Sequence, residues 1–274
     1  MRKVQWQTTA FGAVLGRQIR GVATLLLPSA VRQWLRTQQR RYRLQSVPVG
    51  TVEFGTLRRL TPISPVFGLD RGLPIIDRHY IEDFLARHSA DIRGRVLEMG
   101  DASYTRKFGG DRVSDSDVLH SEPGNPAATI VADLTDADHL PADSFDCVIV
   151  TQTLQMIYDV RAALRCLYRI LKPGGVVLAT SHGISRIARR EGIDPWGEYW
   201  HFTAQSSKRL FEEVFPADGV RIVTYGNVLA ATASLHGLSA TELSPHELAH
   251  HDPDYEVLIA VHARKPLAAP AERD

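Results

Sequence analysis

The chain has 274 residues and a formal net charge of +1. Because 44% of its residues are hydrophobic, a chain of this length can bury an ample core within one α/β domain. No apolar run approaches the ~18 to 20 residues that span a bilayer, which excludes a membrane-spanning helix. The two cysteines, Cys147 and Cys166, lie in apolar strand and helix patterns, which indicates buried small side chains rather than a disulfide or a metal-ligand pair. We therefore expect a reducing, cytoplasmic compartment.

The first fifty residues form a separate basic arm. Residues 1–50 contain nine Lys or Arg and no Asp or Glu, whereas the remainder contains 23 basic and 31 acidic residues. Apolar residues recur there at helical spacing, with Trp34 and Leu35 among basic side chains, which predicts an amphipathic N-terminal helical extension. The arm lacks the clean apolar core and the cleavage site of a secretory signal.

Two interpretations of this arm remain open. A basic amphipathic helix is suited to lie on an anionic membrane surface, here through residues 1–45, which would make the protein peripheral to the membrane. Alternatively, the arm packs on its own domain or on a partner subunit of a homo-oligomer. We expect no nucleic-acid binding, because the basic residues lack an interleaved aromatic platform or a known binding module.

Residues 51–90 join the arm to the rest of the chain. Prolines and glycines between residues 62 and 74 predict an irregular segment, and the apolar spacing that follows predicts a helix over 76–88. In a purely structural leader, the charges of Asp70, Arg71, Asp77 and Arg78 could pair with one another.

Residues 95–180 alternate between apolar strands and a helical stretch. Strands are predicted at 95–100, 112–117, 128–133, 145–150 and 176–180, with a helix over 160–171. This order predicts a parallel sheet with right-handed crossovers, which binds ligands beyond the carboxyl ends of its strands. Carboxylates lie at or near the predicted ends of the first three strands, at Glu98, Asp117 and Asp133.

The order of these pieces resembles a class I S-adenosylmethionine-dependent methyltransferase of the type 11 group. The resemblance covers roughly residues 90–182, and it is most specific at Leu140-Pro-Ala-Asp-Ser-Phe-Asp-Cys-Val-Ile-Val150 and Leu167-Tyr-Arg-Ile-Leu-Lys-Pro-Gly-Gly175. It implies a doubly wound, Rossmann-like seven-stranded sheet over residues 91–266, with last strands at 220–225 and 255–263 and a C-terminal tail at 267–274. It also implies S-adenosyl-L-methionine as cofactor and residues 51–90 as a partial lid over it.

The resemblance also implies which residues bind the cofactor. Glu98 and Gly100 match the turn that holds the methionine end, Asp117 the acid that holds the ribose hydroxyls, and Asp133 with Leu134 the pair that meets the adenine. Asp101 in the first turn and Gln152 after the fourth strand complete the predicted set. Independently of the family, a carboxylate suits a ribose diol because it accepts two charge-assisted hydrogen bonds.

The first turn departs from the family pattern. Three glycines are usual there, but this chain has Gly100-Asp101-Ala102-Ser103-Tyr104, which reduces close backbone approach to the cofactor. A dinucleotide-dependent oxidoreductase needs the missing second glycine to admit a pyrophosphate, so that alternative is disfavoured. The eroded turn also leaves open a non-catalytic methyltransferase-like binding or scaffold protein recruited through its basic arm.

Acceptor recognition is expected after the fourth and fifth strands. His182 is the first candidate for a catalytic base and His201 the second, because a histidine can take a proton near neutral pH. The aromatic phrase at residues 196–203 is either an acceptor pocket or a cap on the core, and Thr203 is the predicted N-cap of a helix over 204–215. Family prevalence favours O-methylation of a small-molecule or glycan hydroxyl or carboxyl.

His246-Glu247-Leu248-Ala249-His250 matches the metalloprotease pattern His-Glu-x-x-His. Ser244 and Pro245 predict the start of a helix, and Pro253 ends it almost at once. The helix is thus too short for that active site, and a third ligand is missing. We therefore expect neither proteolysis nor a stoichiometric structural metal.

Overall fold

The computed structural model describes residues 54–188 and 197–268. The chain divides into two compact units, 1–58 and 59–274. Predictions about the basic arm at 1–50 and about Trp196 therefore lie outside the described residues, as does most of the predicted tail at 267–274. Among the described helices, none has the length and hydropathy that crossing a membrane requires.

The second unit is built on a seven-stranded sheet with the order β3-β2-β1-β4-β5-β7-β6. Its strands are β1 (Gly94–Met99), β2 (Val113–His120), β3 (Ile130–Val131), β4 (Phe145–Thr151), β5 (Leu171–His182), β6 (Val220–Tyr225) and β7 (Leu258–Arg264). The first five strands pair in parallel, whereas β7 is antiparallel to both β5 and β6. The predicted Rossmann-like sheet is confirmed, and it is mixed rather than wholly parallel.

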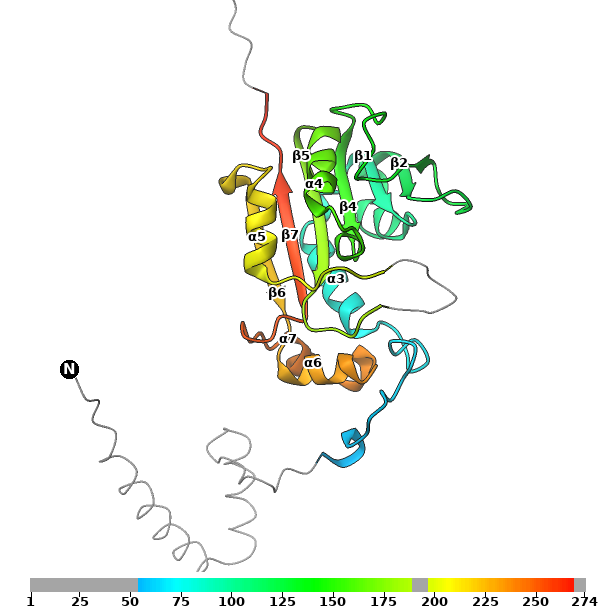
Figure 1. Ribbon diagram of the computed structural model, residues 1–274, viewed down its shortest axis with the longest axis vertical. Coiled ribbons are helices and arrows are strands. Elements are labelled where there is room, and N and C mark those ends of the chain that lie inside the picture. Colours follow the sequence, from blue (N-terminus) through cyan, green and yellow to red (C-terminus); the bar gives the residue numbers. More distant parts are fainter. Residues whose placement is uncertain (1–53, 189–196, 269–274) are drawn as a thin grey trace, which may run out of the picture. The chain divides into compact units, whose positions relative to one another are not determined.

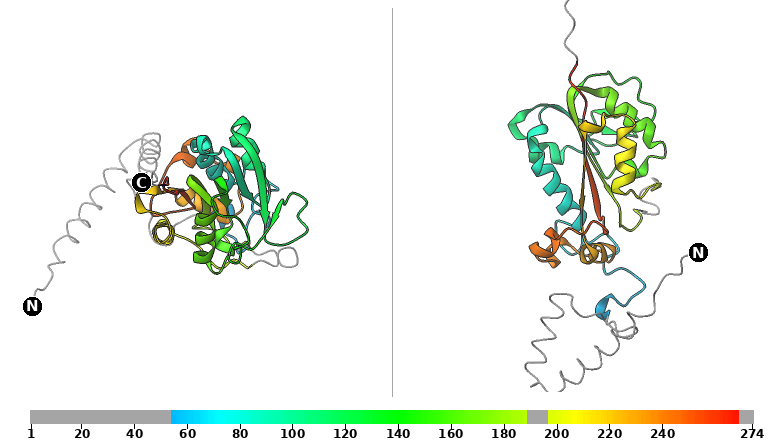
Figure 2. Two further views of the ribbon diagram at one scale, coloured as in Figure 1. Left: turned by 90° about the horizontal axis from the view of Figure 1, so that it is seen from above. Right: turned by 90° about the vertical axis from the view of Figure 1, so that its left-hand side faces the viewer.

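Helices cover both faces of this sheet (Figures 1 and 2). Side chains alternate along β4: Cys147 and Ile149 pack with α3 (Ile76–Arg87), α6 (Val228–Leu235) and α7 (Pro245–Ala249). Val148 and Val150 pack on the other face with α4 (Val160–Ile170) and α5 (Ala204–Glu212). Because both faces are covered, β4 reads as a continuous apolar run, which is typical of a buried parallel strand. The doubly wound arrangement follows.

Local side-chain chemistry fixes several helix ends. Asp159 caps α4 by accepting a hydrogen bond from the Ala162 amide at 2.9 Å. Thr203 caps α5 within a capping box that includes Ser206, as predicted for Thr203. The sequence did not predict α6, which is short and rich in alanine and is capped by the Asn227 side chain.

The second strand is longer than predicted. It was expected to end at Asp117, but β2 continues to His120 because Val118 and Leu119 are buried and pair with Glu98 and Met99 of β1. The carboxyl end of β2 is therefore three residues further along the chain. This shift changes which acid follows the carboxyl end of the strand.

The leader before α3 packs against the segment that follows α6. The amides of Ile63 and Ser64 both donate to the His236 carbonyl, at 2.9 and 3.1 Å, and the Ala240 amide donates to the Pro74 carbonyl at 3.0 Å. The sequence suggested that the four charged residues of this leader, Asp70, Arg71, Asp77 and Arg78, could pair with one another, but two of them have other partners. Arg71 forms an ion pair with Glu242, and Asp70 accepts a hydrogen bond from Ser64.

Candidate cofactor and acceptor site

Three neighbouring parallel strands, β1, β4 and β5, bring sequence-predicted residues to one edge of the sheet. Gly100 follows β1, Gln152 follows β4 and His182 ends β5. Gly100 has φ +83°, and a Cβ placed there would meet nothing within 4 Å, so the backbone is open on that side. Gln152 also has a positive φ, +50°, and its amide donates to the Thr180 carbonyl at 2.8 Å. Ligands bind at such an edge in open α/β sheets.

Glu98 lies beneath this edge rather than on it. Its side chain is buried, and its carboxylate accepts hydrogen bonds from the Tyr104 amide at 3.0 Å and from the amide and hydroxyl of Thr105, both at 2.7 Å. Burial raises the pKa of Glu98 above its ordinary value, and the bonds from Thr105 and Tyr104 oppose that rise. Because both oxygens are engaged by the chain, Glu98 fixes the turn that follows β1.

The departure from the glycine pattern is accommodated within this turn. Tyr104 is buried, and its ring packs with Phe108, on the α3 side of the sheet, with the Arg78 guanidinium 5.5 Å from its centroid. The Tyr104 hydroxyl also accepts a hydrogen bond from Arg78. Asp101 is exposed, and its carboxylate accepts a hydrogen bond from the Ser103 amide at 2.6 Å. The Tyr104 side chain therefore packs in the core, and the guanidinium of Arg78 lies next to the turn that follows β1.

The predicted ribose ligand Asp117 is placed differently from the expectation. It lies within β2, where its carboxylate pairs with Arg95 at 2.8 Å and accepts a hydrogen bond from the Thr129 hydroxyl at 2.8 Å. Its expected position at the end of the strand was wrong, because the apolar pair after it extends β2. The acid that follows the true strand end is Glu122, which is exposed.

The loop after β2 returns to the turn after β1. The Gly100 amide donates to the Leu119 carbonyl at 3.0 Å, and the Asn125 side chain donates to the Gly100 carbonyl at 2.6 Å. The segment that carries Glu122 is therefore tied at both ends to the glycine turn. A carboxylate in this segment is suited to accept hydrogen bonds from a diol bound at that edge.

The predicted adenine pair is divided between surface and core. Asp133 is exposed after β3, where its carboxylate accepts hydrogen bonds from the amide and hydroxyl of Thr135 at 2.8 and 2.9 Å. Leu134 is 4% exposed and belongs to the core on the α4 side of the sheet. Asp133 thus occupies the expected edge, whereas Leu134 offers almost no surface to a ring.

The two predicted catalytic histidines lie together on the acceptor side. Their rings meet edge to face at a centroid distance of 4.8 Å. The carboxylate of Glu198, whose side chain is 1% exposed, contacts the Nε2 atom of His182 and lies 3.9 Å from the Nε2 atom of His201. On its other side, the Nδ1 atom of His182 is 3.2 Å from the Gln152 side-chain oxygen and 3.5 Å from the Gln155 nitrogen. Glu198 therefore orients His182.

The protonation of His182 follows from this environment. Burial lowers the pKa of His182 below the ordinary histidine value, the negative charge of Glu198 opposes that change, and the neighbouring His201 lowers the pKa further. The lowered pKa favours the neutral form of the His182 ring. A neutral imidazole held by a buried carboxylate can accept a proton from an acceptor group.

Aromatic side chains form the rim next to these histidines. Tyr158, Tyr199 and Trp200 are exposed by 70%, 56% and 41%, and Tyr158 meets Trp200 in a stacked arrangement at 6.0 Å. The Trp200 indole donates to the Ile157 carbonyl at 3.0 Å, and the Tyr199 amide donates to the Gln155 carbonyl at 2.8 Å. Of the predicted aromatic phrase, Phe202 is a core residue, while Tyr199 and Trp200 face solvent beside the site.

The leader at residues 51–90, which the sequence predicts as a partial lid, contacts the loop that follows β5. Phe67 in the leader has φ +60°, and its ring lies 3.9 Å from the guanidinium carbon of Arg186, in the segment that follows β5. The Ala188 amide in the same segment donates to the Glu198 carboxylate at 2.5 Å. The leader is thus linked through this loop to the acceptor-side carboxylate.

Four residues of the site were not identified from the sequence as ligands or catalytic partners: Arg78, Glu122, Asn125 and Glu198. Glu122 could have been found by extending β2 through the apolar pair at Val118. Glu198 carried a weaker signal, as the acid within the aromatic phrase. The positions of Arg78 beside Tyr104 and of Asn125 beside Gly100 depend on long-range packing that spacing does not reveal.

The fold is a doubly wound α/β sheet with a histidine–carboxylate cluster at the ends of β4 and β5. Residues 103–179 match the family described as Methyltransferase domain. This match supports the resemblance to class I S-adenosylmethionine-dependent methyltransferases that the sequence predicted.

Individual relatives are distant. The chain is 27% identical over 119 residues to a ubiquinone/menaquinone biosynthesis C-methyltransferase of Enterobacter sp. (strain 638), a match that covers 35% of this chain and 47% of that relative. The chain thus spans about half the length of the curated relative it matches.

Two solved structures are similar at low identity. A SAM-dependent methyltransferase from Archaeoglobus fulgidus is 14% identical, with TM-score 0.47 and coverage of 69% of this chain and 94% of that one. N-methyltransferase NodS from Bradyrhizobium japonicum WM9, in complex with S-adenosyl-L-homocysteine, is 14% identical, with TM-score 0.46 and coverage of 75% and 95%. Both TM-scores are below 0.5, so neither likeness carries an argument about the function of this chain.

Proposed function

We propose that this protein transfers a methyl group from S-adenosyl-L-methionine to a hydroxyl group of a glycan or of a small glycan-like molecule. The observation that carries the proposal is the buried His182–Glu198 pair beside an exposed aromatic rim, at the sheet edge where a methyltransferase cofactor binds. The match of residues 103–179 to the methyltransferase family model supports the cofactor, and the side chains around the edge support the acceptor class.

The residues at the edge fit the cofactor. Gly100 supplies an open backbone, Glu122 and Asp133 supply exposed carboxylates for ribose hydroxyls and an adenine amino group, and Arg78 supplies a cation for a carboxylate. Glu98 holds the turn through its three internal hydrogen bonds. S-adenosyl-L-methionine, when bound, supplies an electrophilic methyl group on a sulfonium, so the chain itself contributes alignment and proton removal.

Proton removal distinguishes the possible acceptors. A hydroxyl keeps its proton at neutral pH and gains from a base, whereas a carboxylate has already lost it. Burial lowers the pKa of His182, which favours the neutral ring that a base requires, and Glu198 fixes the orientation of that ring. In this proposal His182 accepts the hydroxyl proton, and Glu198 stabilises the resulting imidazolium.

The rim favours a sugar over a flat apolar molecule of the same size. A sugar ring has an apolar face of C–H groups bordered by hydroxyls, so it can stack on an exposed aromatic ring while its polar edge stays hydrated. Tyr158, Tyr199 and Trp200 offer such faces, and three hydrogen bonds to the backbone of residues 155–157 fix the Tyr199–Trp200 segment. A pocket for a wholly apolar substrate would instead be more enclosed.

Calorimetry and methyl-transfer assays test this function. The full-length protein should bind S-adenosyl-L-homocysteine and transfer labelled methyl groups to oligosaccharide acceptors. His182→Asn should lower turnover by about 10²- to 10⁴-fold with cofactor affinity unchanged, whereas Trp200→Ala should mainly raise KM for the acceptor. Tyr255→Ala, an exposed ring on the segment before β7, is the matched control for the rim and should alter neither.

Binding without any turnover on hydroxyl acceptors would favour a non-catalytic methyltransferase-like protein. No binding at millimolar cofactor would overturn the enzyme proposal itself. Turnover that survives His182→Asn but is lost in His201→Asn would move the base to the second predicted histidine.

A further inference from the structure

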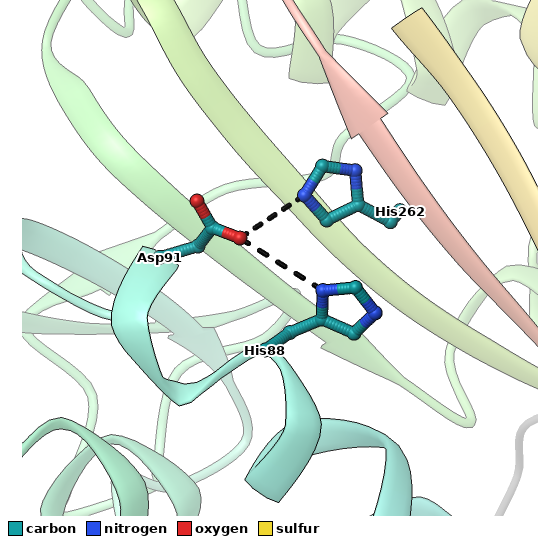
Figure 3. Close-up of side chains that lie close together, drawn as sticks. All are labelled: His88, Asp91 and His262. Carbon is teal, nitrogen blue, oxygen red and sulfur yellow. Dashed lines mark hydrogen bonds and ion pairs between the residues drawn. The ribbon is translucent and has the colours of Figure 1, made fainter.

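A second cluster of histidine and carboxylate side chains lies away from the proposed acceptor site (Figure 3). His88 is the residue that ends α3, Asp91 belongs to the following turn, and His262 is in β7. One Asp91 carboxylate oxygen is 3.1 Å from His262 Nε2 and 3.8 Å from His88 Nδ1. In Figure 3 both rings turn a nitrogen toward that oxygen. Proposed methyl transfer uses none of these side chains.

We propose that His88, Asp91 and His262 form a binding site for one divalent transition-metal ion, with zinc as the best fit. Two imidazoles and one carboxylate are a ligand set that zinc accepts, with water or another ligand in the fourth position. The proposal concerns a structural role, because the ligands come from the end of α3 and from β7 and would be joined through the metal.

The distances between the ligand atoms suit a tetrahedral ion. With metal–ligand bonds of about 2.0–2.1 Å, ligand atoms in a tetrahedral zinc site are about 3.3 Å apart. The two separations from the Asp91 oxygen, 3.1 and 3.8 Å, bracket that value, and all three ligand atoms lie within 4.8 Å of one another. Small side-chain rotations, without movement of the backbone, would complete the geometry.

Arg264 sets the strength of this site. Its guanidinium donates to the second Asp91 oxygen at 2.7 Å, which orients the carboxylate and leaves the first oxygen toward the histidines. Such outer hydrogen bonds are common around metal ligands. The positive charge of Arg264 also repels a cation, so the site should bind zinc less tightly than the same three ligands alone.

The cluster is separate from the acceptor site. In the β5–β7 pairing His262 lies opposite Leu178, whereas His182 at the acceptor edge lies opposite Leu258. Four residues of strand correspond to about 13 Å. The side chains of His88, Asp91 and His262 are exposed by 26%, 20% and 10%, so an ion can reach them from solvent. The proposal revises the sequence-based expectation that no structural metal is present.

Metal titration of the full-length protein, without a histidine tag and after chelator treatment, tests the proposal. Equilibrium dialysis with zinc should give one ion per chain, and cobalt should give the visible absorption of a tetrahedral site. His262→Gln and His88→Gln should each weaken zinc binding by at least about tenfold.

Matched controls separate this site from other histidines. His246→Ala tests the exposed His-Glu-x-x-His pair, and His201→Asn tests the acceptor cluster; neither should change the affinity. Far-UV circular dichroism must show folded variants, and the partly exposed His88→Gln remains informative if His262→Gln fails to fold. Absence of a stoichiometric ion, or loss of binding only in the His246 or His201 variants, would overturn the proposal. Metal affinity is measured without the methyl-transfer assay, so the two proposals fail independently.

Discussion

Replacing Glu98 by alanine should destabilise the protein by about 2–4 kcal/mol. The buried carboxylate accepts three hydrogen bonds, from the Tyr104 amide and from the amide and hydroxyl of Thr105. Alanine leaves two buried amides without a partner, each at a cost of about 1–3 kcal/mol. Part of that loss is offset, because burial raises the pKa of Glu98, which means that the folded protein carries a desolvation cost for the charge.

Urea unfolding followed by far-UV circular dichroism measures this loss. Asp101→Ala is the control, because it removes one hydrogen bond to an amide from an exposed carboxylate and should cost well under about 1 kcal/mol. Affinity for S-adenosyl-L-homocysteine should fall together with stability in Glu98→Ala, since Glu98 acts through the turn. If Glu98→Ala were as stable as the wild type but bound the cofactor weakly, Glu98 would be a direct ligand and the present interpretation would be wrong.

Three further predictions concern other parts of the chain. Glu122→Ala should weaken S-adenosyl-L-homocysteine binding by about 1.5–3 kcal/mol in calorimetry. Asp117→Ala, which breaks a partly exposed ion pair, should leave binding nearly unchanged and cost at most about 1 kcal/mol of stability. The opposite ranking of the two affinities would restore Asp117 as the ribose ligand. The acid limb of kcat/KM should titrate below the ordinary histidine pKa of about 6.5, because His182 must be neutral, and Glu198→Gln should move that limb to still lower pH; an unmoved limb would remove His182 from the role of base. Deleting residues 1–45 should abolish salt-sensitive binding to anionic vesicles and preserve cofactor affinity, and a full-length protein that ignores such vesicles at low salt would make the arm a packing or oligomerisation element.

The order and type of the main elements were determined by the sequence. Local hydrophobic periodicity indicates which residues must be buried, and burial in turn decides where an element forms. This holds for the apolar run at β4, the periodic helix α4 and the last strands. The caps at Thr203 and Ser244 were predictable for the same reason, because a capping side chain bonds an amide only three residues away. The family-level phrases in β4 and β5 therefore sufficed to predict the family whose model matches residues 103–179.

Only the tertiary structure decided which side chains face the ligand edge. Asp117 and Glu122 are equally plausible acids in the sequence, but the pairing of β2 with β1 carries the strand past Asp117 to His120. Glu198 reaches His182, and His262 reaches Asp91, across long stretches of chain. Such contacts depend on strand order and register, which local spacing does not encode, so the sequence supplied the residues of these sites and the fold supplied their partners.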